Sequence, residues 1–135
     1  MAREAVRRMG QGETSSLAGL ANGRLRDVTA KMIAVAARQG DKMACEIVAN
    51  AANYLGIGLS NLVNIFNPEA IVIGGGLSKM GNMLLQPARK VIEERAFKLP
   101  SRTVRIVRAR LGSNAEMMGA AAYVFDRQLA NRRKT

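Results

Sequence analysis

Two stretches of this 135-residue sequence have the composition of a buried β-strand, and this small number limits what the chain can build. Residues 70–73, AIVI, and residues 103–109, TVRIVRA, are rich in β-branched residues. The first stretch has no polar alternation, so we expect burial on both faces, as in a parallel or mixed sheet covered by helices. Sheets usually contain about four to six strands, so two strands alone make too small a sheet. We infer that the chain is part of something larger.

Helical periodicity accounts for much of the remaining sequence. Apolar residues recur at helical spacing from residue 41 to about residue 66. Asp41 is a favourable N-cap for this long helix, and the pair Asn67-Pro68 should end it. Gly56 and Gly58 each cost such a helix about 1 kcal/mol relative to alanine. We expect these glycines to permit close approach by another backbone.

Shorter helices are expected on both sides of the long one. Thr29 should cap one of them and Gly40 should end it, whereas the glycines and small polar residues of segment 10–26 predict a loop. Pro87 is expected in or near the first turn of a helix that begins around residue 82. The order helix, strand, helix, strand, helix indicates an α/β fold that is rich in helix and has a small sheet. The shorter helices are expected over residues 2–9, 29–39, 82–97 and 115–130.

Charge and composition exclude several classes of function. The chain carries 21 Lys and Arg against 10 Asp and Glu, but these basic residues are spread along it. A solvated basic surface is therefore favoured over a nucleic-acid-binding face. Histidine is absent and there is one cysteine, which excludes Ser-His-Asp and Cys-His catalysis and a Cys/His zinc site formed by this chain alone. Because the sequence has neither a membrane-spanning apolar run nor a signal peptide, we expect a cytoplasmic protein without a membrane partner.

The strand at residues 70–73 runs directly into three consecutive glycines, Gly74, Gly75 and Gly76. Glycine adopts positive φ readily and carries no Cβ, so flat or phosphorylated ligands can approach backbone N–H groups there. Open α/β sheets bind ligands at the carboxyl ends of their strands, where these glycines lie. Ser78 could add a hydroxyl or cap the following helix. A turn with close helix–strand packing explains the glycines equally well, and the motif is not GxGxxG.

A second turn, LGSN at residues 111–114, follows the second strand in the same way. Ser113 and Asn114 are suitable N-caps, and Gly119 with the neighbouring alanines makes a thin helix face. Close packing explains that face better than a ligand does. Two such turns after two strands could nevertheless line the same edge of one cleft.

Taken together, YLGIGLSNLVNIFNPEAIVIGGGLSKMGNMLLQPARKVIEE and RIVRARLGSNAEMMGAAA resemble the C-terminal part of the ROK family. This family contains bacterial glucokinases, related sugar kinases and sugar-responsive repressors. The upstream segment VTAKMIAVAARQGD fits as well, so the resemblance covers roughly residues 28–126. It implies a partial actin-like (ribonuclease-H-like) ATPase domain, namely the C-terminal lobe, with ATP and sugar bound in a cleft between two lobes. The expected organisation is an N-terminal helix and connector at 1–27, the ROK-like lobe at 28–130 and a basic tail at 131–135.

The resemblance implies nucleotide-binding residues at both turns and no catalytic residue. The glycine turn would lie near adenosine or ribose and the LGSN turn would be secondary, although Glu116 stands where glucokinases often carry glycine. The family's Asp-x-Gly-Gly-Thr phosphate motif, Glu-x-Gly-His sugar motif and cysteine-rich zinc motif are absent. The implied cofactor is ATP with Mg²⁺, and no zinc is expected in this chain. The implied nucleotide-binding residues are Gly74, Gly75, Gly76, Leu77, Ser78, Asn114 and Ala115.

The function implied is that of the nucleotide-facing part of a sugar kinase resembling glucokinase, which transfers the γ-phosphoryl group of ATP to a hexose hydroxyl. Because the catalytic base and phosphate motif are missing, we expect the chain alone to be inactive and to bind hexose only together with the missing N-terminal lobe. The alternatives are the effector part of an ROK repressor, a small basic nucleic-acid-binding module, or a truncated domain that self-associates through apolar surfaces. We also expect a homo-oligomer.

Overall fold

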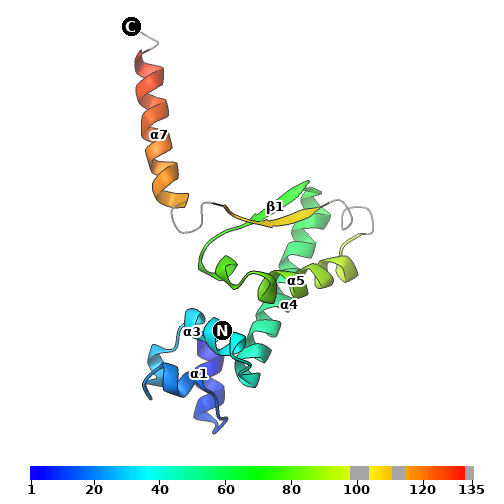
Figure 1. Cartoon of the computed structure of the whole chain (residues 1–135). Helices are drawn as coiled ribbons and strands as arrows, with labels where there is room; N and C mark the ends of the chain where they lie inside the picture. Colours follow the sequence, from blue (N-terminus) through cyan, green and yellow to red (C-terminus); the bar gives the residue numbers. More distant parts are fainter. Residues whose placement is uncertain (98–103, 111–114, 133–135) are drawn as a thin grey trace.

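The computed structural model describes residues 1–97, 104–110 and 115–132. Its helices and a small sheet form one packed body, from which the last helix extends alone (Figure 1). In chain order the elements are α1 (Ala2–Gly10), α2 (Leu17–Leu20), the 3₁₀ helix η1 (Leu25–Asp27), α3 (Ala30–Arg38), α4 (Lys42–Phe66), β1 (Ala70–Ile73), the 3₁₀ helix η2 (Gly76–Met80), α5 (Asn82–Arg95), β2 (Arg105–Arg108) and α7 (Ala115–Arg132).

The ends of α3 and α4 are set by local side-chain chemistry, as the sequence predicts. Thr29 accepts a hydrogen bond from the amide of Met32 at 3.3 Å, and Asp41 accepts one from the amide of Ala44 at 2.9 Å. At the other end of α4, Asn67 adopts a left-handed conformation with φ 43°. The 25-residue helix α4 that results packs against α1, α3 and α5.

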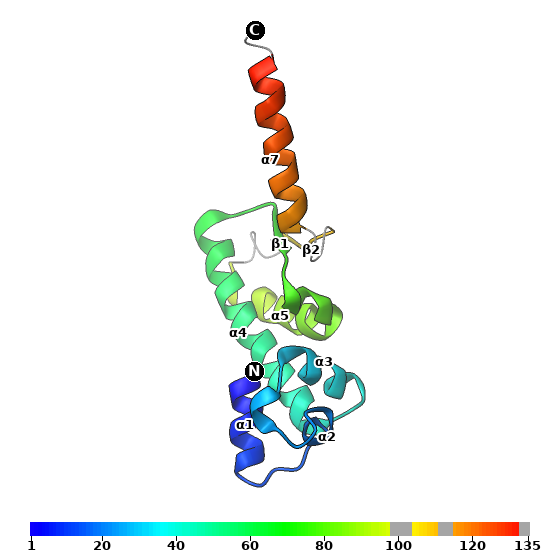
Figure 2. The ribbon, with the colours of Figure 1, turned by 90° about the vertical axis from the view of Figure 1, so that its left-hand side faces the viewer.

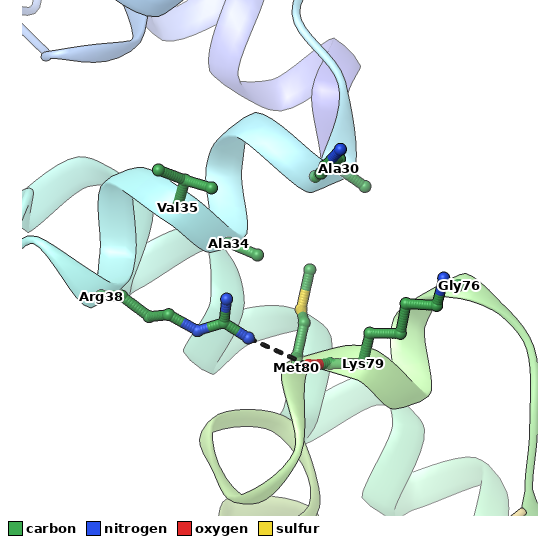
Figure 3. A pocket seen from close by; sticks show the side chains of 8 residues that line it. Ala30, Ala34, Val35, Arg38, Gly76, Lys79 and Met80 are labelled. Carbon is green, nitrogen blue, oxygen red and sulfur yellow. Dashed lines mark hydrogen bonds between the residues drawn. The ribbon is translucent and has the colours of Figure 1, made fainter. Parts of the chain in front are cut away.

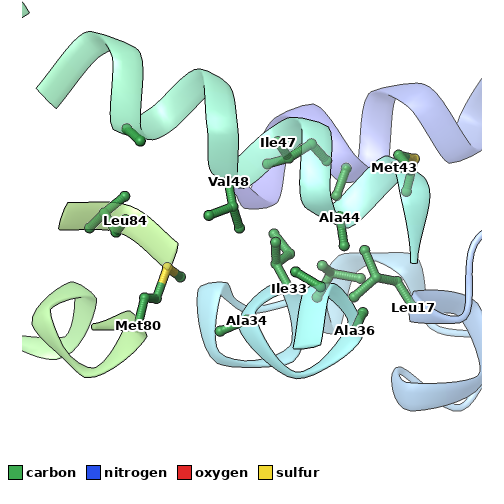
Figure 4. Packing of buried hydrophobic residues seen from close by; sticks show 14 of the residues in the cluster. Leu17, Ile33, Ala34, Ala36, Met43, Ala44, Ile47, Val48, Met80 and Leu84 are labelled. Carbon is green, nitrogen blue, oxygen red and sulfur yellow. The ribbon is translucent and has the colours of Figure 1, made fainter. Parts of the chain in front are cut away.

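The larger core cluster fills the space between α3, the N-terminal half of α4 and the segment before α3 (Figure 4). Leu17, Ile33 and Met43 are at least 98% buried there. The predicted loop at residues 10–26 is therefore wrong in part, because it contains α2 and part of η1 and contributes core residues. Asp41 also fixes this segment, since its Oδ2 accepts hydrogen bonds from the Ser15 hydroxyl and from the amide and hydroxyl of Ser16.

The sheet consists of β1 and β2, which pair in parallel with α5 as the crossover between them. A smaller core cluster lies between this sheet and the helices α4 and α5, and it includes Val63, Ile92 and Ile106. The prediction that the first strand is buried on both faces is wrong. Val72 is 63% exposed and Val107 is 42% exposed, because α4 and α5 both cover the same face of the sheet.

Helix α5 crosses α4 at a glycine. A Cβ atom added at Gly56 would lie 2.6 Å from Cβ of Val91 and 2.8 Å from the carbonyl oxygen of Ala88, so the predicted close approach is confirmed there. At Gly58 the prediction is wrong, because an added Cβ would meet no atom within 4 Å. Gly56 thus allows the two helices to pack more closely than any side chain would permit.

The N-terminal part of α5 agrees with the sequence prediction. The helix begins at Asn82, and Pro87 lies in its second turn, next to the first. Leu84 and Leu85 are both buried, so the apolar stripe of the helix already starts before the proline. The helix ends at Arg95 rather than at residue 97.

Helix α7 stands apart from the body of the molecule, as the rotated view in Figure 2 also shows. All of its side chains from residue 117 to residue 127 are exposed, including Val124 at 53% and Phe125 at 65%. Within the described residues, no helix is both long and apolar enough to cross a membrane.

Candidate functional site

The three glycines after β1 differ in what their backbone requires. Gly75 has φ 75° and ψ −173°, a conformation that is essentially restricted to glycine. A Cβ at Gly74 would make an ordinary contact with Ala109 at 3.7 Å, and a Cβ at Gly76 would meet nothing within 4 Å. The tight turn therefore depends on Gly75, whereas the bare backbone at Gly76 leaves open space beside it.

Ser78 has a structural partner inside the same turn. Its hydroxyl donates a hydrogen bond to the carbonyl oxygen of Gly75 at 2.7 Å, and the residue is only 3% exposed. The side chain does not cap α5, because the first turn of that helix starts from Gly81, with the amides of Leu84 and Leu85 bonded to its carbonyl. Ser78 therefore holds the glycine turn closed.

A cavity of about 550 Å³ lies between this turn and α3 (Figure 3). Its volume falls within the range of pockets that bind small molecules, roughly 300–1,000 Å³. The α3 side is lined largely by small or aliphatic side chains, and the η2 side by exposed backbone at Gly76 and the thioether of Met80. The lining residues are Ala30, Lys31, Ala34, Val35, Arg38, Gly76, Lys79 and Met80.

The charged side chains among the described lining residues of the cavity are all positive. Lys31, Arg38 and Lys79 are three cations among the lining residues, and those residues include no carboxylate. The guanidinium of Arg38 donates a hydrogen bond to the carbonyl oxygen of Lys79 at 3.0 Å, which joins the end of α3 to η2. An apolar surface beside three cations suits a ligand that combines a flat apolar group with negative charge.

The structure brings together only some of the residues predicted from sequence. Gly76 lines the cavity, whereas Gly74 and Gly75 precede it in the turn and are not among the lining residues, and Ser78 supports the turn from within. Asn114 lies outside the described residues, and nothing is described of the Leu77 side chain. Ala115 begins α7, and its side chain lies outside the described part of the structure.

The three cations were missed by sequence reasoning. Lys31 and Arg38 lie seven positions apart in a helix, about two turns, so both lie on the same side of α3 as Ala34. That spacing is the signal in the sequence that points to a shared face. No such signal marks Lys79, because its position depends on the path of the glycine turn.

The described part of the chain does not assemble a metal site of its own. No group of three or more Cys, Asp or Glu side chains comes together within it, and histidine is absent from the sequence.

Comparison with known families matches the ROK family over residues 5–127. The chain belongs to the ROK family. A xylose repressor of Caldicellulosiruptor bescii is 34% identical over 104 residues, which are 77% of this chain and 26% of the repressor. A glucokinase of Streptomyces coelicolor is 37% identical over 106 residues, which are 78% of this chain and 33% of the enzyme.

A solved structure extends the similarity of this ROK chain to three dimensions. The ROK glucokinase of Streptomyces griseus, in complex with glucose and AMPPNP, aligns with a TM-score of 0.78 and 34% identity. The alignment covers 90% of this chain and 40% of that enzyme. The chain thus spans between a quarter and two fifths of the length of these relatives, which include both a kinase and a repressor.

Proposed function

We propose that this ROK chain is the nucleotide-binding part of a sugar kinase and that it holds ATP between the glycine turn and α3. The observation that carries the proposal is the cavity of about 550 Å³ beside Gly76, whose described lining residues include three cations and no carboxylate. The base or ribose would lie against Ala34, Met80 and the bare backbone of Gly76. The phosphates would extend toward Lys31 and Lys79 in the lining of the cavity.

The likeness to a glucokinase solved with AMPPNP supports this assignment, as does the position of the turn at the carboxyl end of β1. We further propose an actin-like lobe of the ROK fold, in the cytoplasm, in which Gly74, Gly75, Gly76, Leu77, Asn114 and Ala115 lie near the nucleotide and Ser78 supports the glycine turn from within. When bound with ATP, Mg²⁺ would neutralise phosphate charge. This chain's own residues contribute binding and orientation, because the described part lacks a cluster of carboxylates to hold the ion.

The experiment is a titration of the purified chain with AMPPNP and Mg²⁺ by calorimetry, comparing wild type with Gly76→Val. A Cβ at Gly76 would meet no atom within 4 Å, and Gly76 lines the cavity. We therefore expect the valine side chain to occupy part of the cavity and affinity to fall at least about tenfold while the fold persists. Gly58→Val is the matched control, because it adds the same side chain in open space on α4. It should bind like wild type.

Two results would overturn this proposal. One is a folded wild-type chain that shows no heat of AMPPNP binding, which would favour the effector part of an ROK repressor. The other is Gly76→Val binding as tightly as wild type. Separately, we expect no phosphorylation of glucose by the chain alone, and turnover above background that Gly75→Val abolishes would contradict that expectation.

A second candidate function, self-association, is favoured by the uncovered helix α7. Met117, Val124 and Phe125 share one side of this helix and are 69%, 53% and 65% exposed. Exposed apolar surface of this kind is typical of a contact with other protein. If self-association is the role, light scattering should give a mass that rises with concentration and does not change with nucleotide, whereas a constant monomer mass would refute it.

A further inference from the structure

The guanidinium of Arg38 bridges two elements that lie far apart in the sequence. Arg38 is the last residue of α3, and its Nη2 donates to the carbonyl oxygen of Lys79 in η2 at 3.0 Å, across 41 positions of the chain. Figure 3 shows this bond spanning the side of the cavity at which α3 ends. The bond therefore joins the two walls of the proposed nucleotide site.

The segment that receives this bond is flanked by glycines, the residues with the widest conformational freedom. Gly75 precedes η2 with φ 75° and Gly81 follows it with φ 60°, so glycines with positive φ lie on both sides of a five-residue 3₁₀ helix. The Ser78–Gly75 bond closes the turn only within itself. Burial of Met80 anchors one end of the segment to the core, and Arg38 is the one side chain of the described residues that hydrogen-bonds to η2 from another element.

We propose that Arg38 is a positioning residue that ties η2 to α3 and thereby sets the width of the cavity. The inference rests on the proposed nucleotide function of that cavity. Arginine suits the task because its guanidinium is a rigid, always charged donor, whereas the lysine ammonium is a compact charge on a flexible stem. The rival role for Arg38 is a direct charge contact with phosphate, which Lys31 and Lys79 would share.

A ligand series separates positioning from charge. Binding of adenosine, AMP, ADP and ATP is measured by calorimetry for wild type, Arg38→Met, Arg38→Lys and Lys31→Met. Arg38→Met lacks the hydrogen bond to Lys79, so we expect its affinity for all four ligands to fall by a similar factor. That factor should be about 2- to 10-fold, which is the range for one hydrogen bond. Arg38→Lys keeps the charge at the end of α3 and should not restore binding. Lys31→Met is the matched control, and its loss should grow with phosphate number and vanish for adenosine.

A second measurement tests the hydrogen bond between Arg38 and Lys79 without any ligand. Hydrogen exchange of the peptide that spans residues 76–81 should be faster in Arg38→Met and Arg38→Lys than in wild type and unchanged in Lys31→Met. If wild type binds no nucleotide, the proposed function fails. The exchange data then still decide whether Arg38 holds η2 against α3. Unchanged exchange in Arg38→Met would overturn the proposal. So would a loss of affinity that appears only with phosphorylated ligands and is rescued by Arg38→Lys.

Discussion

Replacing Gly56 with alanine tests the packing of α4 against α5. The added Cβ would lie 2.6 Å from Cβ of Val91, 2.9 Å from its Cγ1 and 2.8 Å from the carbonyl oxygen of Ala88. A rotamer change at Val91 cannot relieve the first and third of these contacts, because they involve Cβ and backbone atoms. The two helices must therefore separate, and overpacking of this kind costs about 1–3 kcal/mol.

Gly58→Ala provides the matched control on the same helix. It gains the same helix propensity, about 1 kcal/mol, and its Cβ meets no atom within 4 Å. The propensity gain is common to both variants, so the difference in their free energies of unfolding isolates the clash. We expect Gly58→Ala to be more stable than wild type and Gly56→Ala to be less stable than Gly58→Ala by about 1–3 kcal/mol.

The assay is urea denaturation followed by far-ultraviolet circular dichroism, with equal m-values as the condition for comparing midpoints. The double variant Gly56→Ala/Val91→Ala should recover only a minor part of the loss, because it removes Cγ1 and leaves Cβ of residue 91 and the Ala88 carbonyl in place. Gly56→Ala that is as stable as Gly58→Ala would refute the close crossing of α4 and α5.

Three further predictions concern the capping site, the small core and the free helix. Burial raises the pKa of Asp41, but hydrogen bonds from the Ala44 and Ser16 amides and from nearby hydroxyls outweigh it and leave the pKa below its ordinary 3.8. The ionised carboxylate therefore stabilises the fold at pH values above its unfolded pKa, and this stabilisation is lost as pH falls through the lower folded pKa. Below about pH 4, the urea midpoint should therefore depend less on pH in Asp41→Asn than in wild type. Ile92→Ala, at a site that is 1% exposed, should lower the free energy of unfolding by about 2–5 kcal/mol, and a loss below about 1 kcal/mol would contradict the described sheet packing. Val124→Lys should reduce any self-association seen by light scattering more than Tyr123→Lys does, because Tyr123 lies outside the side of α7 that Met117, Val124 and Phe125 share; equal effects would refute that side as the contact.

The features that the sequence predicts correctly depend on chemistry within a few residues. Thr29 and Asp41 cap helices through amides three positions ahead, and Asn67 ends α4 beside a proline. Features set by the rotation of one helix against another were not predictable. Gly56 and Gly58 are two positions apart, about 200° around the helix, so only one of them can face α5, and the sequence does not say which.

The same distinction separates the predicted and missed parts of the candidate site. The glycine turn follows a strand, and its tight geometry at Gly75 is a local property. Ser78 turned inward because a 3₁₀ turn brings its hydroxyl back over the carbonyl three residues earlier. Arg38 and Lys79 were missed because their contact depends on how α3 lies against η2, which becomes known only when the core beneath them is packed.

Helix α4 belongs to both core clusters at once. Its N-terminal half packs in the larger cluster, Val63 packs in the smaller one, and Leu55 contacts both. We therefore expect the two clusters to unfold together in one transition, with probes on α3 and on the sheet giving the same midpoint. A ligand that binds the cavity only in the folded protein stabilises the whole fold. Such a ligand should therefore also slow the hydrogen exchange of amides in the sheet, which it does not contact.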